Sequence, residues 1–138
     1  MRDRRNTGLV SSEAPLISNL NIWENVALIK QYHQNMPENQ AKKLALRHLE
    51  RLGLENIADI RDPDLKEKEV FCGMLLRAAM VVDAVILIDR PFKLLPTVMD
   101  STFIYNTLKK IDDLYKQCYI FDYIWNKNKY GTDYAEKG

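Results

Sequence analysis

The chain has 138 residues, of which 46% are apolar and 28% are charged, and its formal net charge is +1. This composition is that of one folded domain and excludes a disordered charged tail. A charge so near neutrality also excludes general attraction to nucleic acid or anionic lipid, so we expect no nucleic-acid binding. Apolar runs such as AVILI at 84–88 are too short to span a bilayer. With no apolar signal core near the N-terminus, we expect a cytoplasmic protein without direct membrane insertion.

The N-terminal third predicts a strand followed by a helix. Residues 7–10, TGLV, read as a short strand, and SSEAP breaks the pattern after it. Asn21 and Glu24 have the spacing of a capping box, in which each side chain bonds the other residue's backbone N–H. We therefore predict a helix over about 22–32.

Two further helices are predicted in the middle of the chain. Pro37 suits the first turn of the next helix, because its missing N–H costs nothing there. Apolar residues then recur at three- and four-residue intervals as far as Leu52, and Gly53 supplies the stop. The charged stretch 61–69 leads into another helix that carries FCGMLLRAAM.

The C-terminal third predicts two core strands joined by a helix. Residues 84–88 are short and continuously aliphatic, which is typical of a parallel strand buried on both faces. Residues 104–115 give a helical stripe, with Thr97 as the cap, and 117–121 read as the second strand. This order predicts a parallel crossover. The tail from Asn126 is polar, and we expect it to be frayed.

Four segments resemble, in order, the ATPase subunits of ABC transporters, and most closely the subfamily of Mla-type phospholipid trafficking. They are TGLVSSEAPLISNLNIWENVAL, LALRHLERLGL, CGMLLRAAM and VILIDRPF, within a match over residues 7–124. The resemblance implies an α/β fold: a partial P-loop-NTPase-like parallel sheet remnant with an ABC-type helical subdomain. It places one domain at 1–125, with the helical subdomain at about 16–82, core segments at 6–12 and 84–125, and a polar tail at 126–138.

The departures from the family fall on its chemistry. The phosphate-binding GxxxxGK[ST] loop, expected ahead of residue 7, is missing from this sequence. At the positions that the family uses for catalysis, the resemblance places Ser12 for the Q-loop glutamine, Phe71 and Cys72 before Gly73 in the signature, Asp89 in Walker B, Arg90 for the general base and Tyr123 for the switch histidine. We expect the bulky Phe71 to obstruct the signature surface. The resemblance therefore implies that Mg-ATP chemistry is lost, that the chain uses no cofactor, and that Asp89 is the sole metal candidate.

Arg90 is the strongest argument against catalysis. A guanidinium cannot accept a proton at neutral pH, and its charge repels magnesium. We expect Arg90 to form an ion pair with a carboxylate such as Asp122. Asp89 is then expected to cap the turn after its strand, and Tyr123 to be a boundary aromatic with a buried ring and a solvated hydroxyl.

The cysteines and histidines are expected to be structural. Cys72 and Cys118 stand outside any CxxC or Cys/His cluster, so they read as reduced, buried thiols. His33 and His48 lie on different predicted helices without a clear third ligand. Packing is the favoured role for both.

The segment after the first strand suggests a docking surface. In ABC ATPases this region receives the coupling helix of the permease, so Ile17, Leu20 and Trp23 either line a groove for a partner helix or close the domain's own core. The leading hypothesis is a catalytically inactive module of a transport system that binds a permease helix or another ABC ATPase subunit, at the inner membrane through that partner. The alternatives are half of a split ATPase, whose phosphate loop another chain supplies, and a fragment of a longer ATPase. Because the family's first strands have no counterpart here, we also expect an exposed sheet edge, covered by dimerisation or by the tail.

Overall fold

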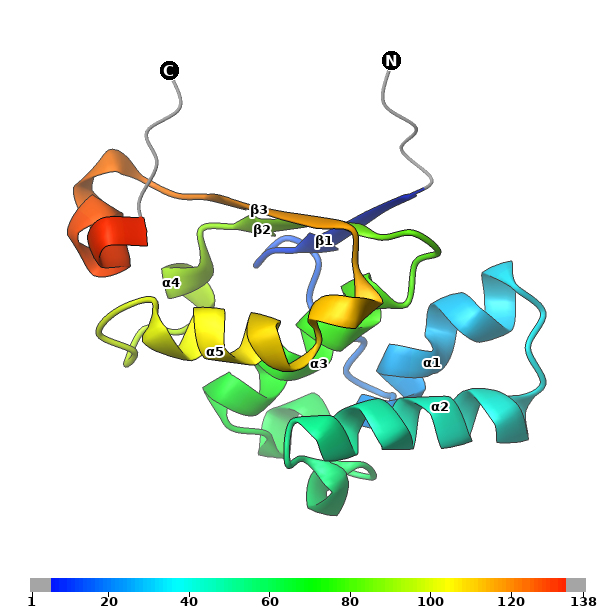
Figure 1. The fold of residues 1–138 in the computed structure, drawn as a ribbon. Helices are drawn as coiled ribbons and strands as arrows, with labels where there is room; N and C mark the ends of the chain where they lie inside the picture. The colour runs from blue at the N-terminus through cyan, green and yellow to red at the C-terminus, as the bar shows by residue number, and fades with distance from the viewer. Residues whose placement is uncertain (1–5, 134–138) are drawn as a thin grey trace.

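A sheet of three parallel strands organises the protein, whose computed structural model describes residues 6–133 (Figure 1). The strands are β1 (Thr7–Val10), β2 (Val85–Asp89) and β3 (Gln117–Phe121), in the order β1-β2-β3. The strands predicted at 7–10 and 117–121 are confirmed, and the middle one begins a residue later than predicted. Strands β2 and β3 pair in parallel, which confirms the predicted crossover.

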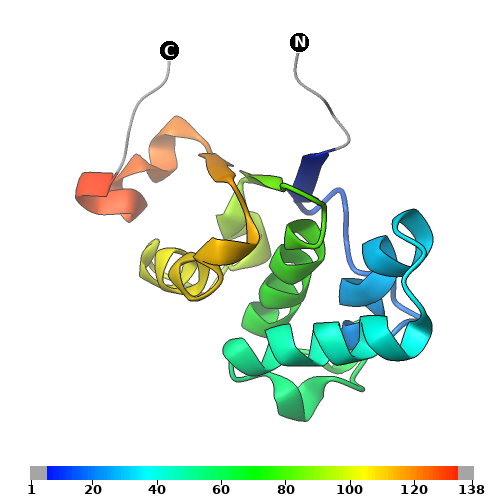
Figure 2. The ribbon, with the colours of Figure 1, turned by 45° about the vertical axis from the view of Figure 1, so that its right-hand side comes forward.

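The helices cover only one face of the sheet (Figures 1 and 2). On that face Ile86 and Ile88 are fully buried, whereas Val85 and Leu87 on the opposite face are half-buried. Leu9 of β1 is 43% exposed. The prediction that the middle strand is buried on both faces is therefore wrong, because no described helix packs on the second face.

The first two helices begin and end where their capping residues indicate. Helix α1 (Ile22–His33) starts at the predicted capping box of Asn21 and Glu24, with both hydrogen bonds present. Helix α2 (Glu38–Arg51) has Pro37 at its N-cap rather than in its first turn. Gly53 follows with a φ of 71°, a left-handed conformation that glycine adopts at little cost. Two short 3-10 helices, η2 (Glu55–Ile57) and η3 (Asp62–Asp64), lead to the next helix.

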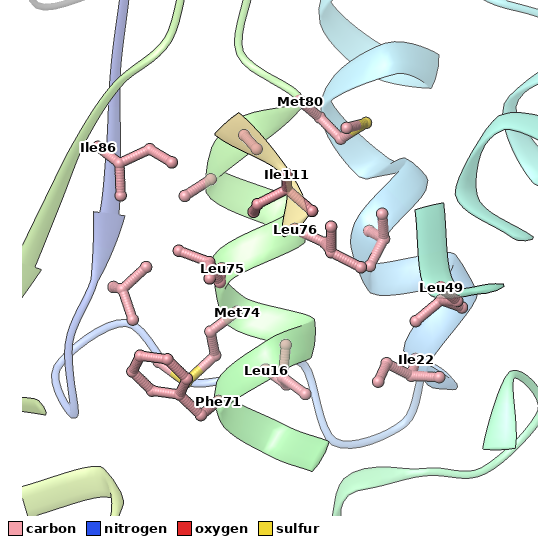
Figure 3. Packing of buried hydrophobic residues seen from close by; sticks show 14 of the residues in the cluster. Leu16, Ile22, Leu49, Phe71, Met74, Leu75, Leu76, Met80, Ile86 and Ile111 are labelled. Carbon is pink, nitrogen blue, oxygen red and sulfur yellow. The ribbon is translucent and has the colours of Figure 1, made fainter. Parts of the chain in front are cut away.

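Helix α3 (Glu67–Ala79) joins the helical layer to the sheet (Figure 3). It packs on α1 along one side and on β1 and β2 along the other. A Cβ added to Gly8 of β1 would lie 2.4 Å from the backbone oxygen of Ala78, so the strand rests directly on the helix. Gly73 is similarly close to α1, where a Cβ would lie 3.0 Å from the Ile22 side chain. The two glycines therefore allow close packing of α3 on β1 and on the Ile22 side chain of α1.

The C-terminal part contains the short helix α4 (Pro91–Leu94), helix α5 (Thr102–Lys110) and the 3-10 helices η4 (Asp112–Leu114) and η5 (Ile124–Asp133). The predicted helix over 104–115 is therefore shorter and starts earlier. The prediction of Thr97 as its cap is wrong, because α5 begins at Thr102 with Ser101 at its N-cap. Of the helices within residues 6–133, none combines the length and the apolar character that crossing a membrane requires.

The first part of the tail is packed on the domain. The Ser101 N–H donates to the Lys129 carbonyl at 2.8 Å. The ring of Tyr130, which is 6% exposed, meets the ring of Phe92 edge-on at a centroid distance of 5.6 Å. The expectation of fraying from Asn126 is therefore wrong up to Asp133, and residues 134–138 lie outside the described residues.

Candidate functional site at the carboxyl edge of the sheet

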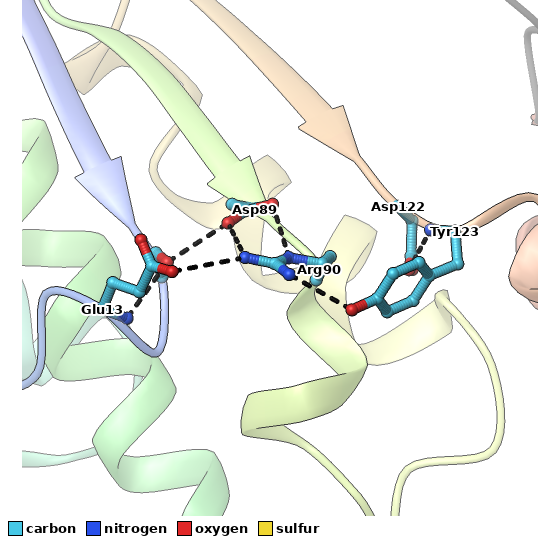
Figure 4. A network of polar contacts seen from close by, with 6 residues as sticks. Glu13, Asp89, Arg90, Asp122 and Tyr123 are labelled. Atoms are coloured by element: carbon cyan, nitrogen blue, oxygen red, sulfur yellow. Dashed lines mark hydrogen bonds and ion pairs between the residues drawn. The ribbon is translucent and has the colours of Figure 1, made fainter.

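Polar side chains converge where the three parallel strands end (Figure 4). Ser11 follows β1 directly, Asp89 is the last residue of β2, and Asp122 follows β3. Because parallel strands end at the same edge of a sheet, residues far apart in sequence come together here. The Ser11 hydroxyl donates to the Asp89 carboxylate at 3.3 Å across 78 positions of sequence.

Arg90 lies at the centre of this cluster. Its Nε donates to Asp89 Oδ1 at 3.0 Å and its Nη2 to Asp89 Oδ2 at 2.9 Å, a bidentate pair. Its Nη1 donates to the Tyr123 hydroxyl at 3.1 Å, and its Nη2 lies 3.8 Å from a carboxylate oxygen of Glu13. The guanidinium therefore bridges the ends of all three strands.

The predicted ion pair of Arg90 exists, but its predicted partner, Asp122, is wrong. Asp122 instead accepts hydrogen bonds from the Tyr123 N–H at 2.7 Å, from Asn126 at 2.9 Å and from the Tyr130 hydroxyl at 2.5 Å. These donors occupy the carboxylate of Asp122, and Arg90 forms its ion pairs with Asp89 and Glu13 instead.

Asp89 does not cap the turn that follows it, so that expectation is also wrong. Helix α4 has no side-chain cap, and both carboxylate oxygens of Asp89 accept hydrogen bonds within the site. The bond from Arg90 is the main cause that lowers the pKa of Asp89 below its ordinary value. The carboxylate is thus ionised at neutral pH and already neutralised by its neighbour.

Tyr123 is half-buried, and its hydroxyl is bound to Arg90 rather than only solvated, which corrects the expectation in part. That hydrogen bond is the main cause that lowers the pKa of the Tyr123 phenol. The ring stacks on Trp125 at a centroid distance of 4.1 Å and an interplanar angle of 11°. Stacking holds the hydroxyl in place for the guanidinium.

The other positions that the resemblance implies for catalysis have different environments. Ser12 is exposed in the turn after β1, and Gly73 is buried within α3. Phe71 is fully buried, with its ring 6.0 Å from that of Phe103, so the expectation that it obstructs a surface is wrong. Cys72 is buried, and desolvation raises the pKa of its thiol to about 12, as expected for a structural thiol.

Sequence reasoning missed the contributions of Ser11 and Glu13. The signal for them is their position directly after a strand that pairs in parallel with the strand carrying Asp89. No group of three or more His, Cys, Asp or Glu side chains within residues 6–133 is arranged to hold a metal ion. What the cluster does chemically is neutralise charge, because the guanidinium satisfies the oxygens that a cation would use.

The predicted docking residues have different environments. Trp23 is 6% exposed and belongs to the core, with Lys42 Nζ 5.1 Å from its ring centre. Ile17 is 43% exposed, and Leu20 is half-buried. Asn25, which is 1% exposed, fixes this segment by hydrogen bonds to the backbone of residues 17, 20 and 21.

A shallow groove of about 190 Å³ runs beside Trp23. Its lining includes Tyr32, which is 76% exposed, and both apolar and polar side chains: Leu20, Trp23, Leu28, Glu24, Gln31 and Glu38. Trp23 belongs to the core and also lines the groove together with Leu20.

The three-stranded parallel sheet with its attached helical layer matches part of the fold of solved ABC transporter cassettes. The chain superposes on the ATP-binding cassette MJ0796 in a dimeric post-hydrolysis state bound to ADP and Pi with a TM-score of 0.62 and 26% identity, covering 89% of this chain and 55% of that chain. A second dimeric structure of MJ0796, a bacterial ABC transporter cassette, gives a TM-score of 0.62 at 24% identity over 88% of this chain and 54% of that one.

In sequence the chain is similar to the intermembrane phospholipid transport system ATP-binding protein MlaF of Haemophilus influenzae, with 27% identity over 89 residues. That match covers 64% of this chain and 34% of the relative, so the chain spans about a third of its length. No protein-family model matches. The predicted fold class and the resemblance to ABC ATPases of Mla type are thereby confirmed.

Proposed function

We propose that this chain is a catalytically inactive ABC-ATPase-like domain that acts as an interaction or regulatory module of a transport system. The observation that carries the proposal is the bidentate ion pair between Arg90 and Asp89 at the carboxyl edge of the sheet. In the resemblance, these two positions correspond to the general base and the magnesium ligand.

The chemistry of Arg90 opposes hydrolysis in two ways. Its guanidinium cannot take a proton from water, and loss of a general base costs about 10²- to 10⁴-fold in rate. It also places a positive charge 2.9 Å from the Asp89 oxygen that would meet a cation. A metal would have to displace Arg90 from Asp89 and from Tyr123 together.

The groove beside Trp23 supports the interaction role. Its lining combines the apolar side chains of Leu20 and Leu28 with polar ones, among which Glu24 and Glu38 suit basic residues on a partner helix. The partner we propose is a helix of a permease or of another ABC ATPase subunit. Through that partner the chain would be held at the cytoplasmic face of the inner membrane.

Calorimetry with millimolar Mg-ATP tests the loss of nucleotide chemistry. We expect no saturable heat, and saturable binding by the unmodified chain would overturn the proposal. The split-ATPase alternative needs Asp89 for joint hydrolysis with a chain that carries GxxxxGK[ST]. Under our proposal, Asp89→Ala leaves the hydrolysis rate of such a partner unchanged.

Titration with candidate permease and ATPase subunits tests the groove. Tyr32→Ala removes an exposed wall of the groove, and Met99→Ala, at an 84% exposed side chain elsewhere, is the matched control. We expect Tyr32→Ala to weaken binding and Met99→Ala to leave it unchanged. Equal affinity of both variants would remove the groove from the proposal.

A further inference from the structure

A cleft of about 470 Å³ lies at the amino ends of β2 and β3, at the opposite edge of the sheet from the polar cluster described above. Its walls come from α1, α2, the end of α3 and the connections that enter β2 and β3, all within residues 30–116. The Gln34 side chain donates to the Met80 carbonyl at 3.4 Å, and the Lys116 N–H donates to the Ala84 carbonyl at 2.8 Å. These bonds tie the walls to one another, so the cleft is formed in advance, as sites for small molecules usually are.

His48 is a buried polar side chain in the wall of this cleft. It is 8% exposed, and no described group lies within hydrogen-bonding distance of its Nδ1. An imidazole ring fills nearly the same volume after a half-turn about its Cβ–Cγ bond, which exchanges Nδ1 and Cδ2. The neutral ring carries one N–H donor. His48 therefore offers a hydrogen bond that a molecule in the cleft can satisfy.

Lys30 brings a positive charge to the same cleft. It is half-buried, and its Nζ donates at 3.0 Å to the side-chain oxygen of Gln34, which carries no charge. None of the ion pairs among residues 6–133 includes Lys30. Its charge is one of the causes that lower the pKa of His48, so the two side chains are near enough for one anion to interact with both.

The carboxylates at the cleft are already held by cations. Asp113 accepts a bidentate pair of hydrogen bonds from Arg51, one of them at 3.1 Å. Asp83 lies 3.9 Å from Lys116. A cationic ligand would have to compete with Arg51 and Lys116 for these oxygens, whereas an anion at Lys30 would replace only a neutral amide.

The remaining lining of the cleft is mostly apolar. It consists chiefly of Leu44, Ala79, Met80, Val81, Val82 and Leu114. Such side chains favour a hydrocarbon group, because covering apolar surface removes it from water. The volume of the cleft is in the range of small-molecule sites, roughly 300–1,000 Å³.

We infer that this cleft binds a small molecule with an apolar body and one carboxylate group, which accepts hydrogen bonds from Lys30 and His48. The apolar body lies against the aliphatic lining. The inference goes beyond the proposed function and does not depend on it. It also gives a reason for a buried nitrogen without a partner, which is costly to the folded chain.

NMR titration of the unmodified chain with 3-phenylpropanoate, at constant ionic strength, tests the inference. The matched probe is 3-phenylpropanamide, which has the same shape without the charge. We expect saturable shifts of the His48 ring signals and a dissociation constant about tenfold lower for the carboxylate than for the amide. His33, the other histidine of the chain, is exposed on α1 outside the cleft, and its signals should not move.

Three outcomes of this titration would overturn the inference. The first is the absence of a saturable shift at His48 up to tens of millimolar carboxylate. The second is an equal shift at both histidines, which would indicate general association with the surface. The third is equal affinity for the carboxylate and the amide, which would show that the site does not recognise the charge.

A charge substitution tests the contact with Lys30. Lys30→Gln should raise the dissociation constant of 3-phenylpropanoate about tenfold and leave that of the amide unchanged. Lys43→Gln makes the same change of net charge at an exposed position of α2 outside the cleft, and it should leave both constants unchanged. Equal effects of the two substitutions would contradict a contact between Lys30 and the carboxylate.

His48→Leu tests the second contact in a variant that we expect to fold, because leucine removes the unsatisfied nitrogen and keeps an apolar side chain. Backbone amide shifts of Val81 and Leu114 report binding when the imidazole signals are gone. We expect the dissociation constant of 3-phenylpropanoate to rise severalfold. A folded variant that binds the carboxylate as tightly as the unmodified chain would remove His48 from the site and overturn the inference.

Discussion

Replacing His48 with leucine should stabilise the protein, and more so in acid. His48 is 8% exposed on α2, and no described group lies within hydrogen-bonding distance of its buried Nδ1. It lines a cleft of about 470 Å³ together with Leu44 and Met80. Packing is the role predicted for His48, and the structure adds that this packing leaves a polar atom unsatisfied.

The expected gain in the free energy of unfolding follows from the unsatisfied Nδ1 atom of His48. A buried polar group without a partner costs about 1–3 kcal/mol, whereas an apolar side chain of similar size at the same place has no such cost. We therefore expect His48→Leu to raise the free energy of unfolding by about 1–2 kcal/mol at neutral pH. The neighbouring apolar residues Leu44 and Met80 provide contacts for the new side chain.

The pH dependence of the free energy of unfolding provides an independent test, because its direction follows from the pKa of His48. Burial is the main cause that lowers the pKa of His48, and the nearby charges of Arg51 and Arg47 lower it further. The unfolded chain therefore binds this proton more readily than the folded one, so the unmodified protein loses stability as the pH falls below about 6.5. His48→Leu has no group to titrate, and its advantage should widen in acid.

Urea denaturation followed by circular dichroism, above and below about pH 6.5, measures both effects. His48→Gln is the control, because it keeps a polar side chain that does not titrate. It should reduce the pH dependence as leucine does, without the gain at neutral pH. A leucine variant less stable than the unmodified protein, or a gap that does not change with pH, would refute the reasoning.

Three other substitutions test the site and the packing around it. Arg90→Gly should raise the pKa of Asp89, measured by carbon NMR titration of its carboxylate; an unchanged pKa would mean that the ion pair does not hold the charge in solution. Gly8→Ala should lower the free energy of unfolding by about 2 kcal/mol or more, since the new methyl group meets the Ala78 backbone at 2.4 Å, and wild-type stability would show that β1 does not rest on α3. Trp23→Ala should cost about 3–5 kcal/mol in chemical denaturation because the ring is core, and a loss below about 1 kcal/mol would restore it as a surface anchor.

The features predicted best from the sequence are those fixed by neighbouring residues. The capping box of Asn21 and Glu24 determines the start of α1 within four residues of chain, and Gly53 ends the next helix through its own backbone conformation. The position of β2 could also be predicted from neighbouring residues, because a short continuous run of aliphatic residues is typical of a buried strand. The aliphatic run does not indicate that helices cover only one face of this strand.

The arrangement of the site could not be predicted because it depends on competition between distant groups. Asp122 was the expected partner of Arg90, but Tyr130, from a tail expected to be frayed, donates to it at 2.5 Å. Glu13 and Ser11 reach the cluster only because β1 pairs with β2 across the whole helical segment. The residues that neighbour Arg90 in the sequence do not indicate which of these groups will contact it.

The backbone at Arg90 explains how one residue closes the edge of the sheet. Successive side chains of a strand point to opposite faces, so a residue that continued β2 would point away from Asp89. Arg90 instead has φ 49° and ψ 63°, a left-handed conformation that is uncommon outside glycine and that turns the chain into α4. In this conformation its guanidinium reaches back to the carboxylate of the preceding residue and across to Tyr123. The closed site therefore depends on both the charge and the turn, so Arg90→Lys, which keeps the charge but not the fork, should retain the turn and lose the bidentate contact.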